Sequence, residues 1–266
     1  MDTKILQKMT ETHDQKLDSQ NDFTNMLFDA HTHLHEQINL GQTFLLCGYS
    51  YESNEQVIEQ AKKYERAYIS LGLAPQQIQR EDLYPNVFEQ IEKVKAQIES
   101  QKNNSRLVAI GEVGLDGHWA KTIQHKQRQF EAFEQMIRLC KKMDLAIVIH
   151  SRKALQECMS TLFASECKRV MLHCFDGDLK QAKIAVDAGW FVSIPPIRSK
   201  NRKKVIQNLG IENLLVESDA PYIAKKSIDA IESVKMIAEY NKLSQNEVLD
   251  KTYQNACKLF KIKQND

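Results

Sequence analysis

The chain has 266 residues, of which 42% are hydrophobic and 27% are charged, and its formal net charge is +1. This composition is that of an ordinary globular protein with enough apolar side chains for a sizeable core, and it excludes a disordered chain. The balanced charge excludes a protein that coats nucleic acid through its overall field, so any phosphate recognition must be local.

The N-terminal segment, residues 1–25, is polar, contains acidic residues throughout and has no continuous apolar run, unlike a secretory signal or a transit peptide. No apolar run elsewhere approaches the roughly 20 residues needed to cross a bilayer. Six cysteines without a CxxC pair or regular spacing favour reduced thiols. We therefore expect a cytoplasmic protein without membrane contact, composed of a polar extension at 1–25 and one domain at 26–266.

From residue 26 onward, short apolar runs alternate with longer amphipathic segments. The runs, each typical of a buried strand, lie at 26–31, 43–49, 67–73, 106–115, 145–150, 169–175, 190–195 and 213–219. Between them, residues 53–64 open with a serine suited to capping a helix, and residues 125–143 show a second helical pattern. Eight strands alternating with helices predict a closed (β/α)8 barrel. The alternative, an open doubly wound sheet, has no GxGxxG or P-loop motif to support it.

Side chains that can bind metal mark five of these runs. They are His31 and His33 with the first run, Glu112 in the fourth, His150 ending the fifth, His173 in the sixth and Asp219 ending the eighth. Any one of them alone could be a hydrogen-bonded core residue. In a (β/α)8 barrel, however, the active site lies at the C-terminal ends of the strands, so all six are expected to meet there. Burying them together without a partner would cost several kcal/mol for each charge, and divalent cations remove this cost.

Four imidazoles and two carboxylates suit Zn²⁺ or Mn²⁺, and Mg²⁺ is a less natural third option. Six ligands exceed the needs of one tetrahedral ion and fit two ions that share a carboxylate and leave positions open for water. Such an ion pair lowers the pKa of water and stabilises both the attacking and the leaving oxygen. The pattern therefore predicts a metal-dependent hydrolase that contains two divalent ions.

Five motifs resemble those of the TatD-like metal-dependent deoxyribonucleases, which belong to the amidohydrolase-type barrels. In order they are "FDAHTHL", "AIGEVGLD", "VIHSRKA", "MLHCFDG" and "LLVESDAPYI", and the similarity runs from about residue 27 to segment 255–260. The resemblance implies that one ion is held by His31, His33, Glu112 and Asp219 and the other by Glu112, His150 and His173. It also implies catalytic roles for the bridging Glu112 and for Asp219, the latter as the base that acts on water.

The resemblance further implies hydrolysis of DNA phosphodiesters, often from a 3′ end, by water activated between two metal ions. Two departures bear on the substrate. The family's GxHP motif reads "GLAP" here, which puts Ala74 where a histidine near the substrate is expected, and the loop after "SDAPYI" is short. The alternative is a related metallohydrolase acting on a small phosphoester, amide or D-aminoacyl substrate. A non-catalytic metal-binding partner protein is disfavoured, because a scaffold needs no open metal positions.

Three side chains near the strand ends are candidates for substrate binding. Arg152 follows the fifth run, His118 follows the fourth, and Arg198 opens the basic stretch after the seventh. Arginine suits bidentate phosphate contact, and the loops after strands seven and eight commonly bind phosphate in barrels. Equally, Arg152 can form a structural ion pair, and the basic stretch can simply be solvated.

The remaining expectations concern neighbours of the site and partners. His35 is expected to lie beyond the site, Trp119 to pack within its loop, and Glu217 to orient a metal-binding histidine. DNA or a small phosphoester is the expected substrate. The protein is expected to act as a monomer without a protein partner.

Overall fold

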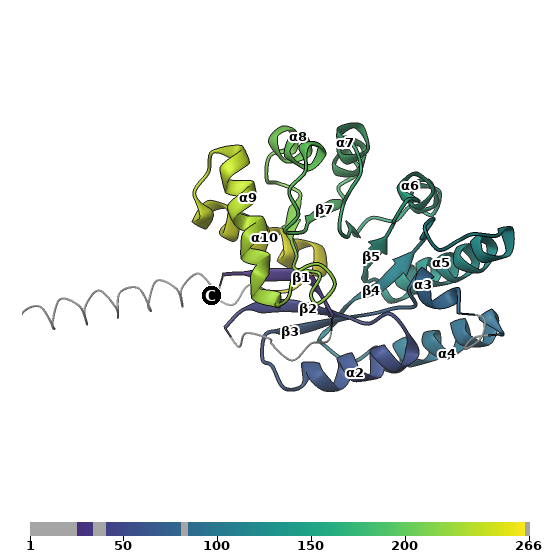
Figure 1. The fold of residues 1–266 in the computed structure, drawn as a ribbon. Coiled ribbons are helices and arrows are strands. Elements are labelled where there is room, and N and C mark those ends of the chain that lie inside the picture. Colours follow the sequence, from purple (N-terminus) through teal and green to yellow (C-terminus); the bar gives the residue numbers. More distant parts are fainter. Residues whose placement is uncertain (1–25, 34–40, 81–84, 264–266) are drawn as a thin grey trace, which may run out of the picture.

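The computed structural model describes residues 26–33, 41–80 and 85–263. Eight parallel strands form one sheet in the order β1 to β8 (Figure 1). Strand β8 contacts β1. The strands are β1 (Phe28–Thr32), β2 (Thr43–Cys47), β3 (Ala67–Leu71), β4 (Leu107–Gly114), β5 (Ala146–His150), β6 (Val170–Leu172), β7 (Phe191–Ile194) and β8 (Leu214–Val216). The predicted (β/α)8 barrel is confirmed.

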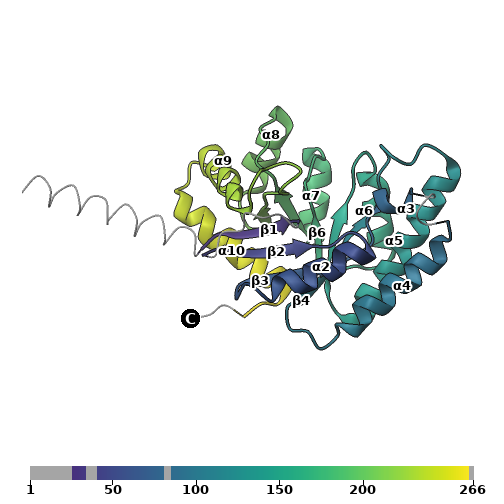
Figure 2. The same ribbon diagram turned by 60° about the horizontal axis from the view of Figure 1, so that its bottom comes forward.

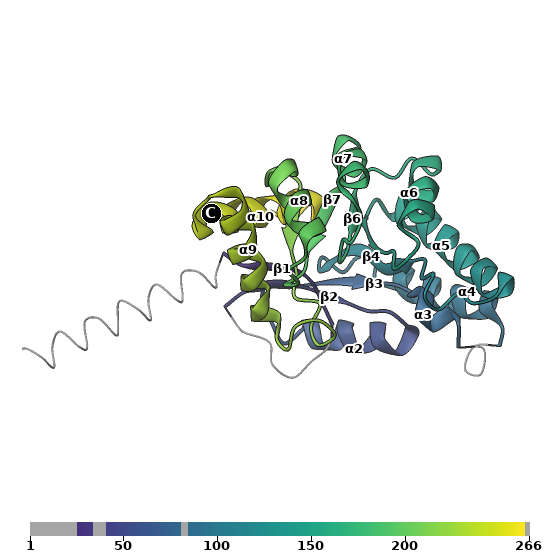
Figure 3. The same ribbon diagram turned by 45° about the horizontal axis from the view of Figure 1, so that its top comes forward.

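Helices surround the strands on the outside of the barrel (Figures 2 and 3). They are α2 (Tyr51–Ala61), α3 (Pro75–Ile78), α4 (Val87–Ser100), α5 (Ile123–Met143), α6 (Leu155–Ala164), α7 (Leu179–Asp187), α8 (Lys200–Leu209), the 3-10 helix η1 (Ser227–Ala230), α9 (Ile231–Asn241) and α10 (Gln245–Phe260). In the described part of the chain, no helix combines the length and apolarity that a bilayer span requires. The predicted extension at 1–25 lies outside the described residues.

The predicted helix at 53–64 begins earlier than its sequence indicates. The cap of α2 is Ser50, whose hydroxyl accepts a hydrogen bond from the backbone N–H of Ser53 at 3.2 Å. Ser53, the residue expected to cap the helix, is a buried residue of its first turn. Both serines are good capping residues, and the position of the chain after β2 decides between them.

The core has an inner and an outer part, because successive strand residues point to opposite faces of the sheet. Phe28 and Leu45 belong to the inner cluster, whereas Phe44 and Leu46 belong to the outer cluster under the helices. Helix α10 contributes to the inner cluster, and the ring of Phe260 stacks on Phe28 with 6.0 Å between centroids. The barrel interior is therefore packed, and a polar site has room only at the mouth.

The seam between β8 and β1 is closed by the segments that follow these two strands. The backbone N–H of Asp219 donates to the carbonyl of His31 at 2.9 Å, and that of His33 donates to Ala220 at 2.8 Å. The fully buried carboxylate of Asp29 accepts hydrogen bonds from the N–H and hydroxyl of Ser218 and from the hydroxyl of Ser227. Burial raises the pKa of Asp29 to about 7, although these hydrogen bonds act in the opposite direction.

A close backbone approach places β4 at the mouth. A Cβ atom built on Gly72, after β3, would lie 2.5 Å from the carbonyl carbon of Gly111 and 2.7 Å from the backbone nitrogen of Glu112. That nitrogen donates a hydrogen bond to the carbonyl of Gly48 at 2.9 Å. Only glycine leaves room for this approach, so Gly72 fixes where Glu112 emerges from the barrel.

We expect Gly72→Ala to lower the free energy of unfolding by about 3 kcal/mol, because the new methyl group meets backbone that cannot move cheaply. Urea denaturation without added metal measures this change. Gly189→Ala is the matched control: Gly189 has φ of 78°, but no atom lies within 4 Å of the point that its new methyl carbon would occupy. Its cost should be about 1 kcal/mol, from the left-handed backbone alone. Equal losses in the two variants would contradict the steric argument.

Candidate metal centre

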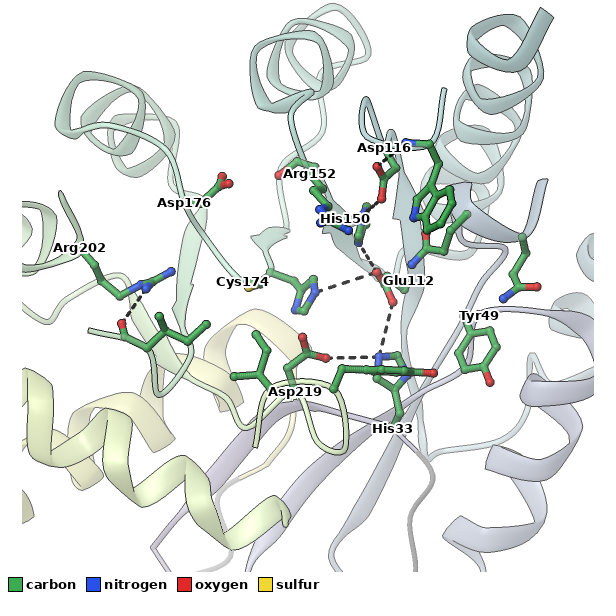
Figure 4. Close-up of a pocket in the computed structure, with 18 residues that line it drawn as sticks. His33, Tyr49, Glu112, Asp116, His150, Arg152, Cys174, Asp176, Arg202 and Asp219 are labelled. Atoms are coloured by element: carbon green, nitrogen blue, oxygen red, sulfur yellow. Dashed lines mark hydrogen bonds and ion pairs between the residues drawn. The ribbon is translucent and has the colours of Figure 1, made fainter. Parts of the chain in front are cut away.

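All six residues predicted to bind metal lie together at the C-terminal ends of the strands. His31 and Glu112 are within β1 and β4, His150 ends β5, His33 and His173 directly follow β1 and β6, and Asp219 follows β8. All are buried except His150, which is partly exposed. Figure 4 shows His33, Glu112, His150 and Asp219 facing one another across the mouth.

Glu112 lies between two groups of side chains and turns one oxygen to each. Its Oε2 is 3.6 Å from Nε2 of His33 and 4.0 Å from Nε2 of His31. Its Oε1 is 2.5 Å from Nδ1 of His150 and 4.0 Å from Nε2 of His173. The two groups, each with ligand atoms within 4.8 Å of one another, have the arrangement that two neighbouring cations sharing one carboxylate would need.

Asp219 completes the first group. Its Oδ1 is 3.5 Å from Nε2 of His33 and 3.8 Å from Nε2 of His31. These two imidazole nitrogens are 3.1 Å apart, so both point at the same small space. A third set of possible ligands, His31, His173 and Glu217, overlaps the other two groups.

Hydrogen bonds on the far side of three imidazoles set their orientation. Nδ1 of His33 lies 2.9 Å from the carbonyl of Cys47, which can only accept, so Nδ1 carries a proton and the lone pair of the neutral ring is on Nε2. Nε2 of His150 is 2.8 Å from Oδ2 of Asp116, and Nδ1 of His173 is 3.1 Å from Oε2 of Glu217. Such partners typically hold metal-binding histidines in one tautomer and orientation.

Burial and mutual attraction shift the proton affinities of the site strongly. Burial alone would raise the pKa of Glu112, but the imidazoles of His150 and His173 hold it well below its ordinary value. Burial acts to lower the pKa of both imidazoles, yet Glu112 and Asp116 raise that of His150 to about 9. Glu217 and Asp219 raise that of His173 to about 10.

His31 behaves differently, because burial and the neighbouring imidazoles His173 and His33 lower its pKa well below the ordinary value. His31 and Glu112 therefore favour their unprotonated forms, which attract a cation. His150 and His173 favour their protonated forms, and a bound cation can replace these protons. This donor set and its burial fit divalent metal ions.

A cavity of about 630 Å³ opens over these residues, a volume within the usual range for a small-ligand pocket. Its lining includes His33, Glu112, His150, His173 and Asp219. The other lining residues are Tyr49, Gln76, Gln77, Asp116, Trp119, Ser151, Arg152, Cys174, Asp176, Ile197, Arg202, Tyr222 and Ile223.

The three predicted substrate-binding residues have different positions. Arg152 lines the cavity (Figure 4). His118 is not among the lining residues, and its ring packs on Trp119 at 5.1 Å between centroids. Arg198 is not among the lining residues either, and its guanidinium forms a 2.7 Å ion pair with Glu239 on α9. The structure therefore gives no support to a substrate contact by Arg198.

Two further expectations about the neighbours of the site have a clear outcome. Trp119 packs on His118 of its own loop, as expected, and its half-exposed ring also lines the cavity. Glu217 does contact a histidine of the site, His173, as expected. His35 lies outside the described residues.

Sequence reasoning missed Asp116 and preferred Arg198 to Arg202 within the basic stretch after the seventh run, although a signal for both residues was available. Asp116 is four residues after Glu112, an even spacing that puts both carboxylates on the same side of an extended strand. Arg202 is three and four residues before Val205 and Ile206, a helical spacing that places it on the buried face of α8.

A model of the TatD related DNase family matches residues 28–261. Human deoxyribonuclease TATDN3 is 33% identical over 218 residues, which cover 77% of this chain and 79% of the relative. The Bacillus subtilis metal-dependent hydrolase YabD is 27% identical over 265 residues, covering 89% of this chain and 100% of the relative. The Escherichia coli TatD homologue YjjV has the same fold, with a TM-score of 0.79 and 22% identity over 90% of this chain and 100% of its own. The resemblance of the five motifs is thus confirmed, and the chain belongs to the TatD-related DNase family of metal-dependent hydrolases.

Proposed function

We propose that this protein hydrolyses DNA phosphodiester bonds with two divalent metal ions, as an exonuclease that acts at 3′ ends. The observation that carries the proposal is the position of Glu112, whose two oxygens face two separate groups of histidines. A carboxylate shared between two cations is a common arrangement in enzymes that cleave phosphoesters. The name of the human relative, a deoxyribonuclease, supports DNA as the substrate.

The residues proposed as metal ligands form two overlapping sets. They are His31, His33, Glu112 and Asp219 for one ion, and Glu112, His150 and His173 for the other. Histidine and carboxylate together favour Zn²⁺ or Mn²⁺, and Mg²⁺ is the third candidate. The ions would lower the pKa of water and offset the negative charge of the phosphate.

Asp219 is the proposed general base, because it combines a place in the cavity wall with a fixed backbone. The N–H groups of Tyr222 and Ile223 both donate to its carbonyl at 2.9 Å, which holds the turn that carries its side chain. Its carboxylate can accept the proton of the water that attacks phosphorus. Glu112 keeps its negative charge at neutral pH, since its pKa lies well below the ordinary value, and its proposed catalytic role is to hold both ions in place.

Arg152 is the proposed contact to the phosphate being cleaved. Its guanidinium lies in the cavity wall and forms no ion pair within the described ranges, so its donors are available to phosphate oxygens. Trp119, Tyr49 and Tyr222 provide aromatic surface in the same cavity, on which nucleobases can stack.

One observation favours the alternative of a small phosphoester, amide or D-aminoacyl substrate. Ala74, which replaces the expected histidine, is fully buried at the start of α3, and the amides of Gln76 and Gln77 line the cavity instead. Neutral amides suit a polar substrate group as well as a phosphate does.

The nuclease activity is tested with a 3′-labelled single-stranded oligonucleotide and Mn²⁺ or Mg²⁺. We expect cleavage by the wild type and a loss of about 10²- to 10⁴-fold in rate for Asp219→Asn, which removes the base. His33→Ala should also lose activity because one metal site is incomplete. Gel analysis of labelled products measures each rate, and the control is Lys95→Ala on α4, which is not among the residues that line the cavity and contacts Gln135 on α5. Bound metal without cleavage of DNA would favour the small-substrate alternative.

Metal binding is tested independently of activity by thermal unfolding. An ion present at 100 times its dissociation constant stabilises the folded protein by about 2.7 kcal/mol. For a chain of this size, Mn²⁺ added after chelation should raise Tm by about 5 to 10 °C. His33→Ala should show a smaller shift. Equal shifts in both proteins, or none in the wild type, would rule out the proposed ligands.

Asp116→Asn tests whether the carboxylate that contacts His150 contributes to metal affinity. The amide oxygen is a weaker acceptor than the carboxylate that His150 now contacts, so this imidazole loses orientation and basicity. We expect Mn²⁺ affinity to fall about 10- to 100-fold, measured by calorimetric titration. Asp178→Asn, at the exposed cap of α7, should leave the affinity as it is; an unchanged affinity in Asp116→Asn would contradict the orienting role.

A further inference from the structure

Arg202 is a buried cation in the wall of the cavity. It lies on the first turns of α8, its residue is only 8% exposed, and it belongs to the lining of the cavity. Its guanidinium donates hydrogen bonds to the carbonyls of Ile197 at 2.6 Å and Phe175 at 3.1 Å. Figure 4 shows the side chain extending toward the cavity from the side opposite Tyr49.

This guanidinium lacks the anion that a buried cation normally has. Within the described ranges, no carboxylate lies at ion-pair distance from Arg202, and its buried Nε–H has no acceptor. Arg198, four residues earlier, does have such a partner in Glu239. Carbonyl oxygens satisfy two donors but do not neutralise the charge, and a buried unpaired charge is costly.

The position of Arg202 relative to the metal centre limits what it can bind. Arg202 comes from α8 and contacts the segments after β6 and β7, whereas Arg152 follows β5 beside His150. Figure 4 shows the two guanidinium groups well separated along the cavity, with Cys174 and Asp176 between them. In the proposed function, Arg152 binds the phosphate at the metal centre. Arg202 is therefore left for a different group of the substrate.

We propose that Arg202 binds a second phosphate group of the substrate, next to the phosphate that is cleaved. This inference rests on the proposed function, and it makes an oligonucleotide with a neighbouring or terminal phosphate the preferred substrate class. Nη1 and Nη2 each keep one N–H beyond those given to the carbonyls of Ile197 and Phe175, and these two donors suit phosphate oxygens. Occupation by phosphate also supplies the missing negative charge.

Asp176 is a possible anionic partner for Arg202, and a structural role is the rival explanation for this arginine. Asp176 lines the cavity too, but its side chain is exposed to solvent and forms no ion pair with Arg202 in the part of the chain that the structure describes. The rival role for Arg202 is purely structural, a link between the loops that contain Phe175 and Ile197. A structural link would affect all substrates equally, whereas a phosphate subsite would affect only those with a second phosphate.

The test compares thymidine dinucleotides without a terminal phosphate, with a 5′-phosphate and with a 3′-phosphate, in the presence of Mn²⁺. We expect wild-type kcat/KM to be about 10- to 100-fold higher for one of the phosphorylated forms. Arg202→Gln should abolish most of this preference, mainly through a higher KM. Arg198→Gln, which changes an arginine outside the cavity, should retain the preference.

Two more variants keep the test decisive if Arg202→Gln does not fold, as judged by circular dichroism. Arg202→Lys retains the charge without the forked geometry and should keep a reduced preference. Asp176→Asn removes a neighbouring negative charge and should increase the preference about 2-fold or more. A preference that none of these variants changes, or a uniform loss on all three substrates, would overturn the phosphate subsite.

The outcome is separable from failure of the proposed function. Bis(p-nitrophenyl) phosphate contains one phosphate and reports hydrolysis at the metal centre alone. If the wild type cleaves neither this ester nor any dinucleotide, phosphodiester hydrolysis itself is wrong. If it cleaves them all without favouring a second phosphate, only the role of Arg202 is wrong.

Discussion

The rest of the structure depends on how the barrel closes between β8 and β1. Closure uses the hydrogen bond from the N–H of Asp219 to the carbonyl of His31, and these two residues also belong to the candidate metal centre. Beside them the buried carboxylate of Asp29 binds Ser218 and Ser227 and so fastens the end of β8 and the start of η1 to β1. The first and last parts of the site are therefore assembled by the same contacts that complete the fold.

The architecture and the six metal-binding candidates could be predicted because both follow from short-range rules. Apolar runs of strand length revealed the eight strands, and the polar residues at their ends had to meet once the barrel closed. The choice between Arg198 and Arg202 could not be made in the same way, because it depends on how α8 packs. The buried face of that helix turns Arg202 inward, and Glu239 on the neighbouring α9 draws Arg198 outward.

The centre is held rigid by neutral and acidic acceptors outside it. The carbonyl of Cys47 and the carboxylates of Asp116 and Glu217 each fix one imidazole, and Gly72 fixes the backbone of Glu112. Donor atoms that are already in place lose little freedom when a cation binds. Buried charges would destabilise an ordinary core, but the proposed divalent cations would neutralise those of this site.

The packed interior of the barrel also limits the routes by which substrate can enter the cavity and product can leave it. Phe28, Phe260 and the other inner side chains fill the interior of the barrel, so in the part of the chain that the structure describes the interior is closed by packed side chains. For the exonuclease proposed above, this means that the DNA strand would not thread through the site. Each released nucleotide would leave by the same opening through which the shortened strand advances, so product release and binding of the next 3′ end would compete.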